Sequence, residues 1–138
     1  MSTKIDHIGI AVSDIEAALR IYRDAIGLPL DSIEKISSEK ITTHHLQIGE
    51  SHIELLHPTD PDSPVARFLE KKGPGIHHIA LAAEDFDAAR ERAIKAGLEP
   101  IGDPSIGAGG KLIQFFHPRT TEGVLLEICS VAESESSS

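Results

Sequence analysis

An internal repeat constrains the fold of this chain more than any other sequence feature. The segment "HIGIAVSDIEAALRIY", which starts at His7, returns as "HIALAAEDFDAARERA" from His78. When the two histidines are aligned, Asp14 falls on Asp85 and several apolar positions coincide. A chain that repeats itself at this spacing is expected to build two copies of one supersecondary unit.

Each copy predicts the same order of elements, one strand, one helix and three strands. Residues 5–12 and 76–83 are rich in Ile, Val, Leu and Ala and predict the first strands. Asp14 and Asp85 supply capping side chains for helices at about 14–26 and 85–96. The remaining strands are expected at about 30–36, 40–48 and 51–57, and at about 99–103, 111–117 and 123–130.

The fold class that follows is α+β, with two paired βαβββ modules. Module 1 covers about 5–57, a linker helix lies at about 62–73, and module 2 covers about 76–130. Each module has one open sheet face, and the simplest way to bury both faces is to pair the modules within one chain. We therefore expect residues 1–131 to form a single duplicated domain, a cup-shaped, barrel-like mixed sheet. The polar end, 132–138, is expected to be disordered.

Composition excludes several classes of partner. The formal net charge is −9, so nucleic acid is not an expected partner, whereas a small anionic molecule with its own local cations is compatible. Cys129 is the single cysteine, and no leader pattern or membrane-length apolar run is present, which indicates a cytoplasmic protein away from membranes. We expect a homodimer, because the exposed edges of curved sheets commonly pair.

Four polar residues interrupt or begin apolar strands in matching places. Glu54 lies within "HIELL" and Glu127 within "VLLEI", in the last strand of each module, and His7 and His78 lie in the first strands. A carboxylate buried at such a position is costly unless it is paired or binds a cation. Taken singly, each of the four is more simply explained as a structural or solvent-facing residue. Four such residues in symmetry-related places favour a shared divalent metal, such as Co²⁺, Ni²⁺, Mn²⁺ or Zn²⁺.

The repeat also separates two neighbouring histidines. Strand alternation sends His77 and His78 to opposite faces, and His78 is the one that aligns with His7. We therefore assign the metal-binding role to His78 and a structural role to His77. Asp6 occupies the place that matches His77.

Longer stretches of the chain resemble a known family. The strings "DHIGIAVSDIEAALRIYRDAIGL", "DSPVARFLEKKGPGIHHIAL" and "FFHPRTTEGVLLEI" are similar to those of the methylmalonyl-CoA epimerase family, in the vicinal oxygen chelate (glyoxalase) superfamily. The resemblance covers nearly the whole chain from Ile5 to Cys129. It implies the paired βαβββ fold around a metal.

The resemblance also implies an enzyme, an isomerase that acts on an acyl-CoA. The ligands that it implies are His7, Glu54, His78 and Glu127, around a divalent ion for which Co²⁺ is the first choice. The implied reaction is epimerisation of (R)- and (S)-methylmalonyl-CoA by α-proton abstraction through a stabilised enolate. Glu127 is implied as one acid–base residue, with Glu54 as a candidate for the other.

The second acid–base residue is where the chain departs from the family. A glutamate found in some members aligns with Thr43, and the neighbouring alternatives are Glu39 and His45. His45 shares a strand face with Thr43, but we favour the simpler interpretation in which His44 and His45 pack or face solvent.

The glycine-rich stretch "SIGAGGK" at 105–111 is interpreted as a lid near the site, with Lys111 close by.

Three other functions are weighed against this one. A glyoxalase I-type lactoylglutathione lyase uses the same four kinds of ligand, so the ligands do not separate it from an epimerase. A ring-cleaving dioxygenase needs a second histidine where Glu54 stands. A metal-free binding module of the same fold has no use for four ligands.

Overall fold

The structure, a computed structural model, describes residues 3–131; the tail that is predicted to be disordered lies outside the described residues. The chain divides into two compact units. One unit is residues 7–77. The other joins residues 3–6 to residues 78–131. That the two units act as one domain remains a prediction.

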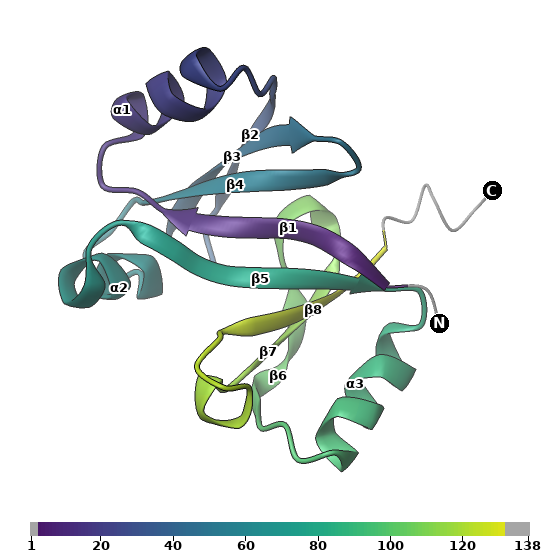
Figure 1. Ribbon diagram of the computed structural model, residues 1–138. Helices are drawn as coiled ribbons and strands as arrows, with labels where there is room; N and C mark the ends of the chain where they lie inside the picture. The colour runs from purple at the N-terminus through teal and green to yellow at the C-terminus, as the bar shows by residue number, and fades with distance from the viewer. Residues whose placement is uncertain (1–2, 132–138) are drawn as a thin grey trace. The chain divides into compact units, whose positions relative to one another are not determined.

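The unit of residues 7–77 follows the predicted order of elements (Figure 1). Its elements are β1 (Thr3–Ala11, from His7 onward), α1 (Ile15–Leu19), a π-helical turn (Arg20–Ala25), β2 (Leu30–Ile36), β3 (Ile41–Ile48), β4 (Ser51–Pro58) and α2 (Pro64–Lys72). The strands pair in the order β2-β3-β4-β1, with β1 and β4 parallel and the other pairs antiparallel. The predicted helix at 14–26 is present, but its second half widens into the π-helical turn.

The two faces of this sheet differ in character. One face carries Leu46 and Leu55, which are fully buried and pack with Ala18 and Leu19 of α1. The opposite face is apolar only at one end, where Leu56 packs against Val65 of α2. The rest of that second face carries histidines and carboxylates, so one side of the sheet supplies the core and the other side is available for chemistry.

The second unit repeats the pattern. Its elements are β5 (Gly75–Ala83, from His78 onward), α3 (Phe86–Lys95), β6 (Pro100–Ile106), a 3₁₀ turn (Ala108–Gly110), β7 (Leu112–Phe116), a 3₁₀ turn (Pro118–Thr120) and β8 (Leu126–Ser130). The strands pair in the order β5-β8-β7-β6, with β5 and β8 parallel. β6 is longer than predicted and contains a register shift between Ile101 and Ser105, whereas β8 begins only at Leu126.

A buried hydrogen-bond network fixes α3 to this sheet. Arg90 of α3 donates to Oε1 of Gln114 at 2.7 Å, and the amide nitrogen of Gln114 donates to the carbonyl oxygens of Ile101 and Gly102 at 3.2 Å. Gln114 is 2% exposed, and these partners satisfy its polar atoms. The opposite face of the same strands carries Glu127, so here too the helix and the candidate site lie on different faces.

Candidate functional site

The four candidate ligands form one close pair in each unit. His7 Nδ1 lies 3.2 Å from Glu54 Oε2, and His78 Nε2 lies 3.2 Å from Glu127 Oε1. All four side chains are at most 7% exposed. Each copy of the repeat therefore buries one imidazole and one carboxylate in contact with each other, as the alignment of the two copies predicts.

Strand register explains the first pair. β1 and β4 run parallel, with Gly9 beside Glu54 and His7 beside His52. Gly9 has no side chain, which leaves the space beside Glu54 open to the imidazole of His7 from the same strand.

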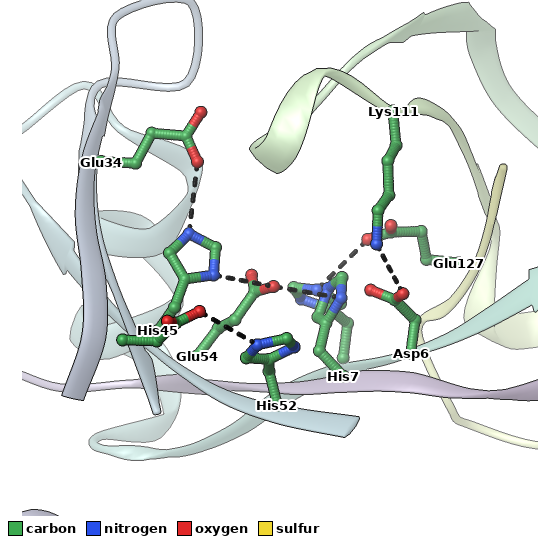
Figure 2. A network of polar contacts seen from close by, with 10 residues as sticks. Asp6, His7, Glu34, His45, His52, Glu54, Lys111 and Glu127 are labelled. Atoms are coloured by element: carbon green, nitrogen blue, oxygen red, sulfur yellow. Dashed lines mark hydrogen bonds and ion pairs between the residues drawn. The ribbon is translucent and has the colours of Figure 1, made fainter. Parts of the chain in front are cut away.

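A second imidazole, His45, meets the same carboxylate (Figure 2). On β3, His45 lies directly across from Glu54, and its Nδ1 is 3.5 Å from Glu54 Oε2. Its Nε2 is 3.2 Å from Oε1 of Glu34, a residue of the edge strand β2. Glu34 is 38% exposed in its side chain, so this chain of contacts runs from a buried carboxylate to a partly exposed one.

The two carboxylates change the acid–base behaviour of His45. Burial disfavours the charged imidazolium, but the hydrogen bonds and negative charges of Glu54 and Glu34 outweigh burial, and the pKa of His45 is raised above its ordinary value of 6.5. His45 is therefore held toward its protonated form. The simpler interpretation, in which His45 only packs or faces solvent, is wrong.

The pair in the second unit has a different surrounding. Phe115 of β7 lies directly across from Glu127 of β8, and its ring contacts that of His78 edge to face, with 5.2 Å between the ring centres. Ala80 of β5 lies on the other side of Glu127. Phe115 also packs against the buried cluster that contains Ala82 and Cys129.

The donor atoms of each pair suit a divalent metal. Two ligand atoms at about 2.1 Å from one ion, at right angles to each other, lie about 3 Å apart. The observed separation of 3.2 Å in both pairs is close to that span. Imidazole nitrogen with carboxylate oxygen is a donor set that first-row divalent ions accept. Each pair is therefore suited to supply two of the ligands of a metal site.

The structure places the alternative acid–base residues as follows. Thr43 is fully buried, and its hydroxyl has no hydrogen-bond partner. Glu39 lies in the turn between β2 and β3, outside both strands. His44 points to the face opposite His45, its Nδ1 has no partner, and burial lowers its pKa. Of these residues, only His45 contacts a candidate ligand.

His77 and Lys111 have contacts of their own. The ring of His77 packs edge to face on Phe68 of α2, at 5.0 Å between ring centres, which fits the structural role predicted for it. Lys111 Nζ lies 2.7 Å from Asp6 Oδ1, and both side chains are largely buried. This ion pair fixes the end of the glycine-rich stretch to the first residues of the chain, within their own unit. A lid function for 105–111 remains a prediction.

Sequence reasoning missed Glu34 and the ion pair between Asp6 and Lys111. Glu34 lies in an edge strand with polar neighbours, where a carboxylate usually faces solvent. A signal for Glu34 was nevertheless present. Glu34 stands nine residues after Ala25, where the helical segment ends, and so falls in the strand expected at 30–36. Antiparallel pairing of this strand with "ITTHHLQI", in the strand expected at 40–48, would have brought Glu34 near His45.

Comparisons with known proteins agree with one another. The family model of the Glyoxalase/Bleomycin resistance protein/Dioxygenase superfamily matches residues 6–115. An ethylmalonyl-CoA/methylmalonyl-CoA epimerase of Cereibacter sphaeroides is 40% identical over 131 residues, which is 93% of this chain and 98% of that protein. Within residues 3–131, none of the helices is long and apolar enough to cross a membrane.

Solved structures give the same result. A methylmalonyl-CoA epimerase from Mycobacterium tuberculosis has a TM-score of 0.89 at 32% identity, over 97% of this chain and 91% of that one. A methylmalonyl-CoA epimerase in complex with methylmalonyl-CoA and NH4+ has a TM-score of 0.90 at 36% identity, over 96% and 97%. These likenesses confirm the predicted glyoxalase fold.

Proposed function

The chain belongs to the methylmalonyl-CoA epimerase family of the glyoxalase superfamily and is an isomerase of that type, and we propose that it interconverts (R)- and (S)-methylmalonyl-CoA with a divalent metal at its site. The observation that carries the proposal is the pair of matched contacts, His7 with Glu54 and His78 with Glu127, both buried and both at 3.2 Å.

We assign the metal to these four side chains. Members of the glyoxalase superfamily bind divalent metal ions, and each unit contributes one nitrogen and one oxygen donor at a separation suited to a shared ion. When bound, the ion would supply positive charge close to the substrate oxygens on which negative charge develops. Co²⁺ is the ion we expect first, with Mn²⁺, Ni²⁺ and Zn²⁺ as alternatives.

The substrate explains why such a site is needed. The α-carbon of methylmalonyl-CoA lies between a carboxylate and a thioester carbonyl, and its proton is acidic only when the resulting enolate is stabilised.

Epimerisation requires a proton to leave one face of the α-carbon and another to arrive on the opposite face. We assign Glu127 to one face and Glu54 to the other. Each is a carboxylate that can accept or return a proton, and their surroundings differ. Glu127 lies directly across from Phe115, whereas Oε2 of Glu54 contacts both His7 and His45.

Three further expectations accompany the proposal. The partner is a small acyl-CoA molecule rather than nucleic acid or membrane. The protein is proposed to be cytoplasmic and to form a homodimer. Sedimentation of the purified protein against its mass of 14.8 kDa would decide the oligomeric state.

Exchange of the α-proton in heavy water tests the mechanism. The native protein should exchange the α-hydrogen of both stereoisomers and interconvert them. With one base on each face, Glu127→Gln should lose exchange of one stereoisomer and Glu54→Gln exchange of the other. Epimerisation should fall by about 100-fold or more in both variants. Proton NMR of each stereoisomer, with separation of the products, measures all of these rates.

A matched control is Glu39→Gln, which removes a carboxylate from a turn outside the site and should leave both rates unchanged. Exchange at the native rate in both Glu127→Gln and Glu54→Gln would contradict the assignment. Turnover of the hemithioacetal of methylglyoxal and glutathione, without turnover of methylmalonyl-CoA, would replace it with a glyoxalase I-type activity.

A further inference from the structure

The two copies of the repeat carry their site carboxylates in unequal surroundings. We propose that Glu34 and His45 are positioning residues that hold Glu54 in the orientation in which it binds the divalent metal, whereas the residue directly across from Glu127 is Phe115. The inference rests on the proposed function, because it takes Glu54 to be a metal ligand. It gives a role in metal binding to two residues that are not among the four proposed ligands.

The unequal surroundings follow from strand register. Glu54 of β4 faces His45 of β3, and Glu127 of β8 faces Phe115 of β7. The two positions are equivalent in the repeat, since each lies on the third strand of its copy, directly across from the carboxylate. One copy therefore places a nitrogen base beside the ligand, and the other places a ring that cannot bind its oxygens.

His45 is itself held from both sides. Its two ring nitrogens lie 3.5 Å from Glu54 Oε2 and 3.2 Å from Glu34 Oε1. Each ring nitrogen thus meets one carboxylate, and the two carboxylates lie on opposite sides of the ring. Rotation of the ring would break at least one of these two contacts, so they fix the oxygen of Glu54 that the ring meets.

The position of Glu34 supports the same role. Glu34 lies on β2 at the edge of the sheet and pairs with Thr43 on β3, so its side chain emerges on the face that carries His45. Its side chain is partly exposed, and a carboxylate there is not required by the core. Its Oε1 contacts His45 Nε2 on the site face.

Contacts of this kind tune metal sites. Residues that hydrogen-bond to a ligating side chain typically change metal affinity by about 10–100-fold when they are removed. We expect His45→Phe, which gives this copy the residue of the other copy, to weaken binding of Co²⁺ within that range. Glu34→Gln keeps the shape and removes the charge, and it should weaken binding in the same direction by a smaller factor.

Titration of the metal-free protein with Co²⁺ alone, followed by calorimetry and by the visible absorption of the bound ion, measures the effect without reference to activity. The native protein, His45→Phe, Glu34→Gln and Glu54→Gln are compared, together with the double variant that combines His45→Phe with Glu54→Gln. If His45 acts through Glu54, its substitution should cost several-fold less in the Glu54→Gln background than in the native one. A changed absorption spectrum in His45→Phe is also expected.

His57→Phe is the matched control. It makes the same substitution in β4, at a position that faces away from Glu54, and Co²⁺ affinity should be unchanged. Far-ultraviolet circular dichroism checks that each variant is folded. If His45→Phe does not fold, Glu34→Gln still tests the proposal, because its position is partly exposed.

The outcomes separate this inference from the proposed function. Native affinity in both His45→Phe and Glu34→Gln, with the ion still bound, would overturn the positioning role and leave the metal site intact. Equal losses from His45→Phe in the two backgrounds would also overturn it, because the residue would then act independently of Glu54. Failure of the native protein to bind Co²⁺ or any of the other three ions would overturn the metal site as well.

Discussion

Two neighbouring residues of β3 show how strongly strand alternation decides the chemistry of a side chain. His45 faces the site, where two carboxylates raise its pKa despite burial. His44 faces the opposite side, where burial lowers its pKa and its Nδ1 has no partner. The same residue type, one position apart, is thus held toward the charged form in one case and the neutral form in the other.

His44 should make the stability of the protein fall at mildly acidic pH. Its pKa is lower in the folded than in the unfolded chain, where it is about 6.5, so the unfolded state binds more protons once the pH falls below that value. Its contribution is therefore complete above about pH 6.5 and is lost as the pH falls toward the folded pKa. Chemical denaturation at several pH values between 7.5 and 5 measures this loss.

The variant His44→Leu isolates that contribution. The native protein should lose more unfolding free energy than His44→Leu between pH 7.5 and 5, and the difference between the two should be constant above pH 7. A parallel pair of curves over the whole range would show that His44 does not titrate differently on unfolding.

At this scale the sequence predicted the residues that the repeat duplicates and missed those that it does not. His7, Glu54, His78 and Glu127 have counterparts, and all four are buried in pairs. His45 has Phe115 as its counterpart, so symmetry gave no reason to select it. Its role depends on Glu34, a partner from another strand, and such a contact follows from register rather than from local pattern.

Among the elements, the helices of the repeat begin in the same way. The side chain of Asp14 accepts a hydrogen bond from the backbone nitrogen of Ala17 at 3.0 Å, and Asp85 does the same for Ala88 at 3.0 Å. Both contacts satisfy a backbone N–H that has no partner within the helix. The sequence predicted both caps, because Asp at this position has few other structural uses.

Removal of the second cap should cost stability. Asp85→Ala leaves the first turn of α3 with an unsatisfied N–H and should lower the free energy of unfolding by about 1 kcal/mol. Urea denaturation measures the change, with Glu84→Ala as the control. Glu84 is the exposed residue just before the cap, and its substitution should change stability by less than about 0.5 kcal/mol. Equal effects of the two substitutions would contradict the capping role.

Element boundaries were less predictable than element types. The helix of the first copy turns π-helical at Arg20, with Ile26 donating to the carbonyl oxygen of Ile21, five residues earlier. β6 was expected to end at about residue 103, but it continues to Ile106 after a register shift between Ile101 and Ser105. Both departures depend on how a segment packs against its neighbours, and local propensity does not contain that information.

For the whole molecule, the proposed metal should act as a folding ligand. An ion that binds only the folded protein stabilises it by an amount that grows with its concentration, about 2.7 kcal/mol at 100 times the dissociation constant. Thermal unfolding of the metal-free protein, with and without added Co²⁺, should show a rise in Tm. His7→Ala and His78→Ala should each abolish most of that rise, because each copy supplies half of the donors.

A shift that survives one of these substitutions and vanishes with the other would contradict a site shared by both copies. The control is Mg²⁺ at the same concentration, since a site with two imidazoles favours first-row transition ions over magnesium.

The fold as a whole was predicted correctly from the repeat, because a duplicated βαβββ pattern leaves few other ways to bury two open sheet faces.

The division of the chain has a consequence for its synthesis. Residues 7–77 are contiguous, so every part of that unit is synthesised before residue 78 is added. The other unit combines residues 3–6 with residues 78–131, and its Asp6–Lys111 ion pair joins the two stretches. Residues 3–6 therefore cannot complete their unit until residues 78–131 have been synthesised, whereas the contiguous unit has no such requirement.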